Sequence, residues 1–372
     1  MTTVSAAAPA TTRAQRPSIL SPTLDLLCVG GLSIIVLVPL LLTGRSDLLL
    51  IGPGAQAWIA TLINMPHFMA SYRMVYRDRD MILRHKWASI YIPLLLFLYA
   101  VVALWQAQYS PDLVTLFVVV ASGYLAWHYT GQVWGMMASY AHLDGNRFDE
   151  QERWLIRGSL RILLVWHLTW FVYHNVVAYD FGLAYQAMNV ATLVAFGLGA
   201  VGLFRMRRRT GRFPPLRALV AWGAIFVWYA ALARDPKALF WVQIAHALQY
   251  LEFPVRVEIN RSVRAAAGRV ARHMVVYAVV LLGISYLLGM IVPRTAMDVI
   301  GATLGERPGQ VAPVLVLSFI NIHHYFTDGV IWKISNPAVR RELFAHVTPP
   351  SAPGEKAASS APGRKQRKGH RR

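Results

Sequence analysis

Long apolar stretches, separated by short charged segments, make up most of this chain. Stretches of about 18 or more residues with almost no charge recur, and each is long enough to cross the hydrocarbon core of a bilayer as a helix. Their apolar residues are continuous rather than alternating, which favours helices over a membrane β-barrel. We therefore predict an all-α, polytopic membrane helix bundle with about ten transmembrane helices. The predicted spans are residues 24–43, 55–73, 88–106, 112–138, 158–178, 186–204, 216–233, 237–253, 273–292 and 311–333.

Arginine and lysine are distributed unevenly between the segments that join these spans. If the N-terminus is cytoplasmic, the inner segments hold most of them, including six arginines between residues 205 and 217. The outer segments hold only Arg45, Arg234, Lys237, Arg294 and Arg307. Because cytoplasmic loops carry an excess of basic residues, this asymmetry predicts a multi-pass protein of the cell inner (cytoplasmic) membrane with both termini cytoplasmic.

The composition agrees with a membrane protein, since 56% of the residues are hydrophobic and 15% are charged, against about 25% charged in soluble domains. Residues between the spans account for most of the net charge of +19, so we expect membrane lipid, and no nucleic acid, as a partner. We predict a disordered cytoplasmic N-terminus at 1–20, the transmembrane bundle at 21–335 and a basic, disordered cytoplasmic tail at 336–372. The tail either contacts anionic lipid or only fixes the topology.

Several familiar kinds of site are missing from the sequence. Cys28 is the only cysteine, so the chain can form neither an internal disulfide nor a cysteine-based metal motif. The chain has no P-loop, no GxSxG nucleophile motif and no HExxH zinc motif. The glycines of GLGAVG, residues 197–202, lie within a predicted span, so we expect them to serve helix packing through small residues.

Histidine gives the clearest indication of chemistry. Ionisable residues within a bilayer are costly, and they usually face the bundle interior and mark a site or a pathway. A single such histidine is more often a hydrogen-bonded packing residue. Seven of the twelve histidines fall within predicted spans, namely His67, His128, His167, His174, His246, His323 and His324.

Four of these histidines lie at a similar predicted depth. His67, His128, His246 and His323 lie about 9 to 16 residues along four spans that run in the same direction, with a rise of about 1.5 Å per residue. Imidazole is the commonest biological metal ligand, and a histidine set without thiolates suits non-haem iron. We therefore predict that these four histidines bind Fe(II). The sequence leaves open whether His167 and His174 join them.

Polar residues close to these histidines extend the candidate site. Asp328 is placed to orient His324, at i,i+4 on one helix face, or His323 across the turn. Tyr250 follows His246 at i,i+4. We assign Asp328, His324 and Tyr250 as catalytic candidates, either as additional ligands or as groups that orient a ligand.

The histidine-bearing segments resemble, in their order along the chain, those of the Brp/Blh-type β-carotene 15,15′-dioxygenases, which are multi-span, iron-dependent enzymes that make retinal. The segments are MPHFMASY, AWHYTGQVW, IAHALQYLEF and NIHHYFTDGVIW. Pro66-His67 matches the family's early Pro-His segment, and His128-Tyr129 matches its His-Phe segment. His246 matches the start of its His-x-x-x-His helix, and His323 with Asp328 matches its last segment.

This chain departs from the family's pattern at two places. Ser71 and Tyr72 stand where the family has an aspartate shortly after the first Pro-His, and Tyr250 replaces the second histidine of the third segment. The resemblance therefore implies a related histidine-rich metal fold more than an identical reaction. Tyr250 would either complete the metal sphere as a phenolate or leave a position for substrate.

Together these patterns predict an integral-membrane non-haem iron oxygenase, a metal-dependent oxygenase or dioxygenase. We expect dioxygen and a lipophilic small molecule as its substrates, such as a carotenoid, another isoprenoid or a lipid chain, with oxidative cleavage of a carotenoid as the reaction that the resemblance implies. Two other functions stay open. One is a transporter or proton-coupled permease with a histidine relay. The other is a haem-binding membrane protein in which His167 and His174, seven residues apart on one helix face, are axial ligands.

Overall fold

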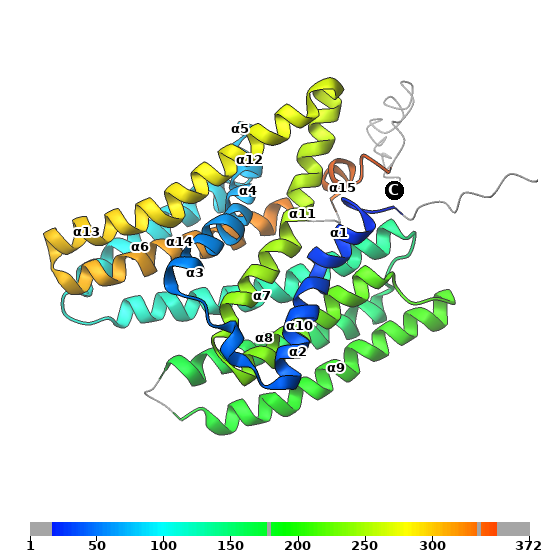
Figure 1. The fold of residues 1–372 in the computed structure, drawn as a ribbon, viewed down its shortest axis with the longest axis horizontal. Coiled ribbons are helices and arrows are strands. Elements are labelled where there is room, and N and C mark those ends of the chain that lie inside the picture. Colours follow the sequence, from blue (N-terminus) through cyan, green and yellow to red (C-terminus); the bar gives the residue numbers. More distant parts are fainter. Residues whose placement is uncertain (1–16, 177–179, 333–335, 348–372) are drawn as a thin grey trace, which may run out of the picture.

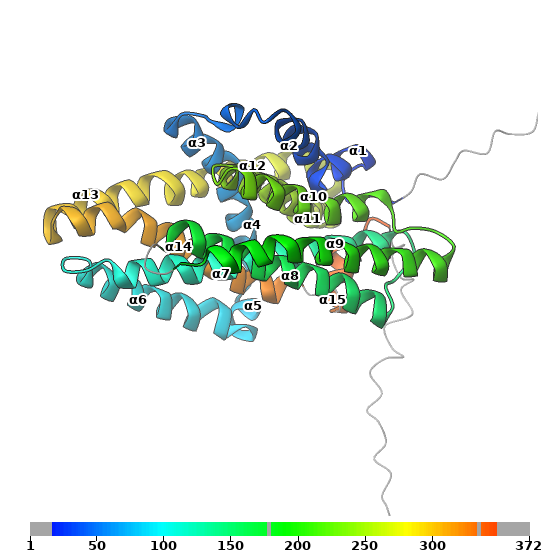
Figure 2. The same ribbon diagram turned by 90° about the horizontal axis from the view of Figure 1, so that it is seen from below.

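The computed structural model describes residues 17–176, 180–332 and 336–347, so the predicted disorder of residues 1–16 and 348–372 lies outside the described part of the chain. Every regular element in the described part is a helix, which confirms the predicted all-α bundle. The longest helices lie side by side in one bundle (Figures 1 and 2). The helices are α1 (Pro22–Leu26), α2 (Leu32–Thr43), α3 (Pro53–Ile59), α4 (Met65–Tyr76), α5 (Arg79–Arg84), α6 (Ile92–Gln106), α7 (Asp112–Leu143), α8 (Glu150–Asn175), α9 (Gly182–Thr210), α10 (Leu216–Arg234), α11 (Ala238–Ala266), α12 (Val270–Tyr286), α13 (Val292–Leu304), α14 (Glu306–Ile331) and α15 (Pro337–Leu343).

Short turns of wider, π-helical form join several of these helices end to end. They connect α1 to α2 (Leu27–Gly31), α3 to α4 (Ala60–Asn64) and α12 to α13 (Leu287–Ile291). Turns of this kind often occur at functional sites. The turn at Ala60–Asn64 is of interest for that reason, because it leads directly into the segment that carries His67.

Eight helices in the described part of the chain are long and apolar enough to cross a membrane, and they indicate a membrane protein. They are Pro22–Thr43, Trp87–Gln106, Asp112–Leu143, Glu150–Asn175, Gly182–Thr210, Leu216–Arg234, Val270–Leu304 and Glu306–Ile331. The prediction of about ten spans differs from this set at two places. Residues 55–73 and 238–253 are helical, within α3–α4 and α11, but they are not among the eight.

The interior positions of α4 and α11 explain this difference. All residues from 65 to 71 of α4 are buried, and α11 contacts α2, α4, α10, α12 and α15. A helix surrounded by other helices does not need an apolar side chain at every position, and it can carry the polar groups that a lipid-facing helix avoids. Both helices carry a histidine of the predicted site, His67 on α4 and His246 on α11.

Helix packing brings the histidine-bearing segments together. α14 contacts α4, α6 and α7, and α11 contacts α4. The hairpin of α13 and α14 extends toward one end of the molecule, and α8 pairs with α9 on another side of the bundle (Figures 1 and 2). This arrangement places α4, α7, α11 and α14 around one shared interior.

Two of the three glycines of residues 197–202, Gly199 and Gly202, serve helix packing, as predicted. A Cβ atom added at Gly199 would lie 2.6 Å from the indole of Trp222, and one added at Gly202 would lie 2.8 Å from Ile156. These two glycines therefore let α9 approach α10 and α8 more closely than any larger residue would permit.

The end of the described chain differs from the predicted disordered tail, because Pro337–Leu343 forms α15 and packs against α11. Leu343 and Phe344 are buried there. Asn260 donates a hydrogen bond of 2.8 Å to the backbone oxygen of Glu342. These contacts hold residues 337–344 against the bundle. This part of the predicted disordered tail is therefore ordered.

Candidate metal centre

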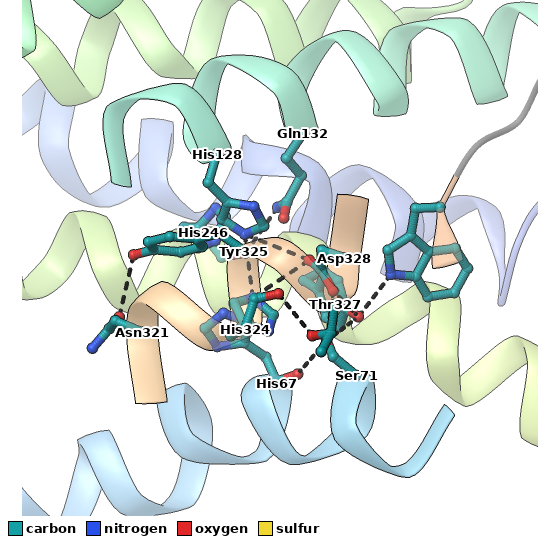
Figure 3. Close-up of polar contacts among 12 residues, drawn as sticks. His67, Ser71, His128, Gln132, His246, Asn321, His324, Tyr325, Thr327 and Asp328 are labelled. Carbon is teal, nitrogen blue, oxygen red and sulfur yellow. Dashed lines mark hydrogen bonds and ion pairs between the residues drawn. The ribbon is translucent and has the colours of Figure 1, made fainter. Parts of the chain in front are cut away.

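Four helices each bring one histidine to the shared interior, with a second polar side chain one turn further along (Figure 3). Residues at i and i+4 lie on the same face of a helix, so each helix presents both groups to the same side. The four pairs are His67 and Ser71 on α4, His128 and Gln132 on α7, His246 and Tyr250 on α11, and His324 and Asp328 on α14.

The four imidazoles form a closed ring in which each one neighbours two others. The centroid distances are 4.6 Å for His67–His324, 4.9 Å for His324–His128, 4.8 Å for His128–His246 and 5.3 Å for His246–His67. Neighbouring ring planes cross at 76° to 88°. All four residues are buried. Donor atoms of His67, His128 and His246 lie within 4.8 Å of one another, as do those of His128, His324 and Asp328.

Hydrogen bonds determine which imidazole nitrogens are available to a ligand. Nδ1 of His67 lies 2.5 Å from the carbonyl oxygen of Asn64, which only accepts, so Nδ1 carries the proton and Nε2 has a lone pair. That Nε2 is buried and has no hydrogen-bond partner among the described residues, and the same holds for both ring nitrogens of His246 and for Nδ1 of His324. A buried polar atom left without a partner costs about 1–3 kcal/mol. A bound metal ion would satisfy such lone pairs.

Asp328 adds a carboxylate to this nitrogen set. Its Oδ2 lies 3.4 Å from Nε2 of His324 and 3.6 Å from Nε2 of His128. The two nitrogens are 3.3 Å apart. Two ligand atoms about 2.1 Å from one ion, at an angle of 90–110°, are about 3.0–3.4 Å apart. The spacing of these donors therefore suits a shared ion after small movements.

The other oxygen of Asp328 is held by two hydroxyl groups. Ser71 Oγ donates to Oδ1 at 2.6 Å, and the Tyr250 hydroxyl donates to the same oxygen at 2.9 Å. Trp332 Nε1 in turn donates to the Tyr250 hydroxyl at 2.7 Å. The structure thus gives Tyr250 the role of orienting the carboxylate. Ser71 and Trp332 were not among the predicted site residues, although the i,i+4 spacing of Ser71 from His67 was an available signal.

His323 lies outside the ring of imidazoles, so the structure does not place it with the other three predicted ligands. Its Nε2 lies 3.1 Å from the Tyr76 hydroxyl and 3.1 Å from the carbonyl oxygen of Ala88. Successive residues are about 100° apart around a helix, so His323 and His324 point to different sides of α14. In the structure it is His324 that stands beside His67 and His128.

The two histidines of α8 are placed elsewhere. Nδ1 of His167 lies 3.2 Å from the Tyr229 hydroxyl, and Nδ1 of His174 donates to the backbone oxygen of Trp170 at 2.9 Å. Neither belongs to a metal-competent group among the described residues. The structure therefore does not bring His167 or His174 into the ring of imidazoles.

A hollow of about 220 Å³ opens beside the imidazoles, between α7, α11 and α14. His128, Tyr250 and Asp328 form its polar side. Most of the other lining residues are apolar or glycine, with Trp127 and Phe253 among them. We call this hollow the site groove, and two of the metal-competent residues, His128 and Asp328, line it.

In comparisons with known proteins, no family model, curated protein or solved structure matched this chain. The donor set of the site itself therefore indicates its chemistry. Imidazole nitrogens with one carboxylate, and no thiolate nearby, suit a divalent transition metal such as iron.

Proposed function

We propose that this chain is an integral-membrane non-haem iron oxygenase that uses dioxygen to oxidise a lipophilic substrate. The observation that carries the proposal is the convergence of buried imidazole nitrogens without protein partners, on His67 and His246, in one interior with His128, His324 and Asp328. Leaving so many polar atoms unsatisfied within a bilayer protein is costly, so the cluster suits a bound ion better than a packing role.

His67, His128, His246 and His324 would hold the Fe(II), with Asp328 as a further ligand or a charge partner. The bound iron would supply the binding and activation of dioxygen. These donors are of the type found in non-haem iron sites, which combine histidine with carboxylate and keep positions open.

The residues around the donors fix their orientation. The carbonyl oxygen of Asn64 keeps the proton of His67 on Nδ1, so that Nε2 faces the cluster as a lone pair. Ser71 and Tyr250 hold Oδ1 of Asp328, which leaves Oδ2 toward His128 and His324. Such supporting contacts normally tune metal affinity and activity.

The site groove would bind the substrate. Its walls of Trp127, Met136 and Phe253 favour an apolar chain and exclude water from beside Asp328. A carotenoid, another isoprenoid or a lipid chain fits this requirement, and the resemblance to Brp/Blh-type enzymes favours oxidative cleavage of a carotenoid. The distribution of basic residues supports a place in the inner membrane with both termini cytoplasmic.

A proton-coupled transporter is the second candidate. The contacts of His128 and His324 with Asp328 favour it, because buried imidazole and carboxylate groups in a row can pass protons. This function requires no stoichiometric metal, so the metal content separates the two.

The experiment that tests the proposal is turnover by the iron-loaded protein in detergent. Oxygen consumption and products would be measured with a carotenoid, a linear isoprenoid and a fatty acyl chain. We expect oxidised product from at least one of them with wild-type protein and none with His246→Ala. Iron-loaded wild type that oxidises none of the three, while it transports protons in vesicles, would favour the transporter.

A further inference from the structure

The site groove continues along α7 into a second hollow with a different character. This second hollow has a volume of about 560 Å³ and shares Gly131, Gly135 and Trp332 with the site groove. Its far side is formed by Arg147, Arg153 and Arg157, together with other residues. We call it the basic hollow. The apolar site groove, which Asp328 lines, thus leads into the basic hollow.

Two glycines keep the passage between the hollows open. Gly131 and Gly135 are one turn apart on α7, and a Cβ atom added at either would meet no atom within 4 Å. Glycine within a helix costs about 0.8–1.0 kcal/mol relative to alanine. The indole of Trp222 packs against Gly199 and explains why that residue is glycine. No neighbouring atom explains why residues 131 and 135 are glycine. The open space suits a ligand chain lying across α7.

Three arginines of the basic hollow have no ion-pair partner among the described residues and are available to bind an anion. Arg147, Arg153 and Arg157 are exposed, and the described residues provide no ion-pair partner for any of their side chains. Other arginines near them are paired, such as Arg209 with Glu152 at 2.8 Å. Three unpaired guanidinium groups at one end of an apolar channel attract an anion, because arginine binds carboxylate and phosphate oxygens in a two-pronged geometry.

We propose that the site groove and the basic hollow together bind an amphiphile with one apolar chain and an anionic headgroup, either a carboxylate or a phosphate. The chain lies in the site groove beside Asp328, and the headgroup lies among Arg147, Arg153 and Arg157. The site groove is smaller than the 300–1,000 Å³ of most ligand pockets, which suits a single chain rather than both chains of a bilayer phospholipid. This inference rests on the proposed function and narrows its lipophilic substrate from a neutral carotenoid to a chain that ends in an anionic group.

Photo-crosslinking tests the inference without turnover. Three probes with the same diazirine-bearing chain would be used: a carboxylate, a phosphate monoester and a neutral alcohol. After illumination in detergent, labelled peptides are located by mass spectrometry. We expect the carboxylate, the phosphate or both to label the α7 peptide that holds Trp127 and Met136, and the probe that labels it identifies the headgroup.

Variants test whether the arginines and the open space beside Gly131 are needed for labelling by the probes. Arg153→Gln with Arg157→Gln is expected to lower labelling by the anionic probes about tenfold, because charge-assisted bonds are lost, and to leave the alcohol unaffected. Gly131→Leu is expected to reduce labelling by all three probes. Arg264→Gln, at an exposed arginine of α11 outside both hollows, is the control and should change nothing.

Two results would overturn the inference. One is labelling by the alcohol as strong as labelling by the acids, with no effect of the double arginine variant. The other is labelling spread over outer helices such as α9 and α13, which indicates general contact with lipid. The same probes applied to His246→Ala, whose altered side chain does not line the groove, separate the two proposals. If the His246→Ala protein binds no iron but is still labelled by the anionic probes, the result supports the binding site alone. If the wild-type protein oxidises a neutral carotenoid with iron but is not labelled by the anionic probes, only the proposed function stands.

Discussion

The hydroxyl groups of Ser71 and Tyr250 lie 2.5 Å apart, although 179 positions separate the two residues in the sequence. Both also donate to the same oxygen of Asp328. The two hydroxyl groups are therefore coupled in space, and together they hold one carboxylate.

A double-mutant cycle at Ser71 and Tyr250 tests this coupling. Ser71→Ala and Tyr250→Phe each remove one hydrogen bond to Asp328 and leave the other. Each is expected to weaken iron affinity, and the double variant is expected to weaken it by about 10–100-fold, as losses of groups that orient ligands do. Iron affinity would be measured by competition with a chelator of known strength.

Tyr72→Phe is the matched control for this cycle. The Tyr72 hydroxyl donates to the backbone oxygen of Ile320 at 2.9 Å and does not contact Asp328. Its loss should leave iron affinity unchanged. An unchanged affinity in the Ser71→Ala/Tyr250→Phe protein would show that the hydroxyl pair does not support a metal site.

The ion pair of Asp25 and Arg217 is expected to anchor the N-terminal helix. Its atoms are 2.7 Å apart and Asp25 is fully buried, with the backbone N–H groups of Ile19 and Leu20 also donating to the carboxylate. Breaking a buried pair leaves an unpaired charge, so Arg217→Met should lower the free energy of unfolding by about 3–5 kcal/mol. Reversible unfolding in mixed micelles measures it.

The pair of Arg45 and Asp47 provides the comparison. Its atoms are 2.8 Å apart, but both side chains are 58% exposed. Solvent screens such a pair, so Arg45→Met should give no measurable change. Equal effects of the two substitutions would contradict the buried anchor.

We expect the contribution of Glu258 to the stability of the fold to be lost at acidic pH. Glu258 lies beyond the predicted span of residues 237–253. Burial opposes ionisation of Glu258, but the His273 hydrogen bond and the charges of Arg73 and Arg77 outweigh it and lower the pKa. A carboxyl with a lowered pKa stabilises the fold above its unfolded pKa, and that stability is lost as the pH falls through the folded value.

Glu258→Gln should therefore destabilise the protein by about 3 kcal/mol at pH 7, as loss of one member of a buried charge cluster does. The difference from wild type should shrink as the pH falls below the ordinary glutamate pKa of about 4.3 and on through the lower folded value. Thermal unfolding in detergent across this pH range measures it. A difference that stays constant down to pH 3 would show that the charge of Glu258 contributes nothing.

Hydrophobic runs predicted the helices well, because a stretch facing lipid must be apolar around its whole circumference. They described the interior helices less well, since α4 and α11 carry polar groups that only their neighbours shield. Depth along the spans indicated that His67, His128 and His246 lie together, and the structure brings them together. The sequence could not separate His323 from His324, because the rotation of α14 depends on its packing against α4 and α7.

The iron content of three proteins tests the central claim most directly, namely wild type, His324→Ala and His323→Ala, each purified from iron-replete cells in mild detergent. The neighbouring histidines are matched controls, since His324 joins the ring of imidazoles while His323 contacts Tyr76 and Ala88. We expect near-stoichiometric iron without a Soret band in wild type and His323→Ala, and strongly reduced iron in His324→Ala. Iron lost from His323→Ala but kept by His324→Ala, or no metal in wild type, would contradict the site.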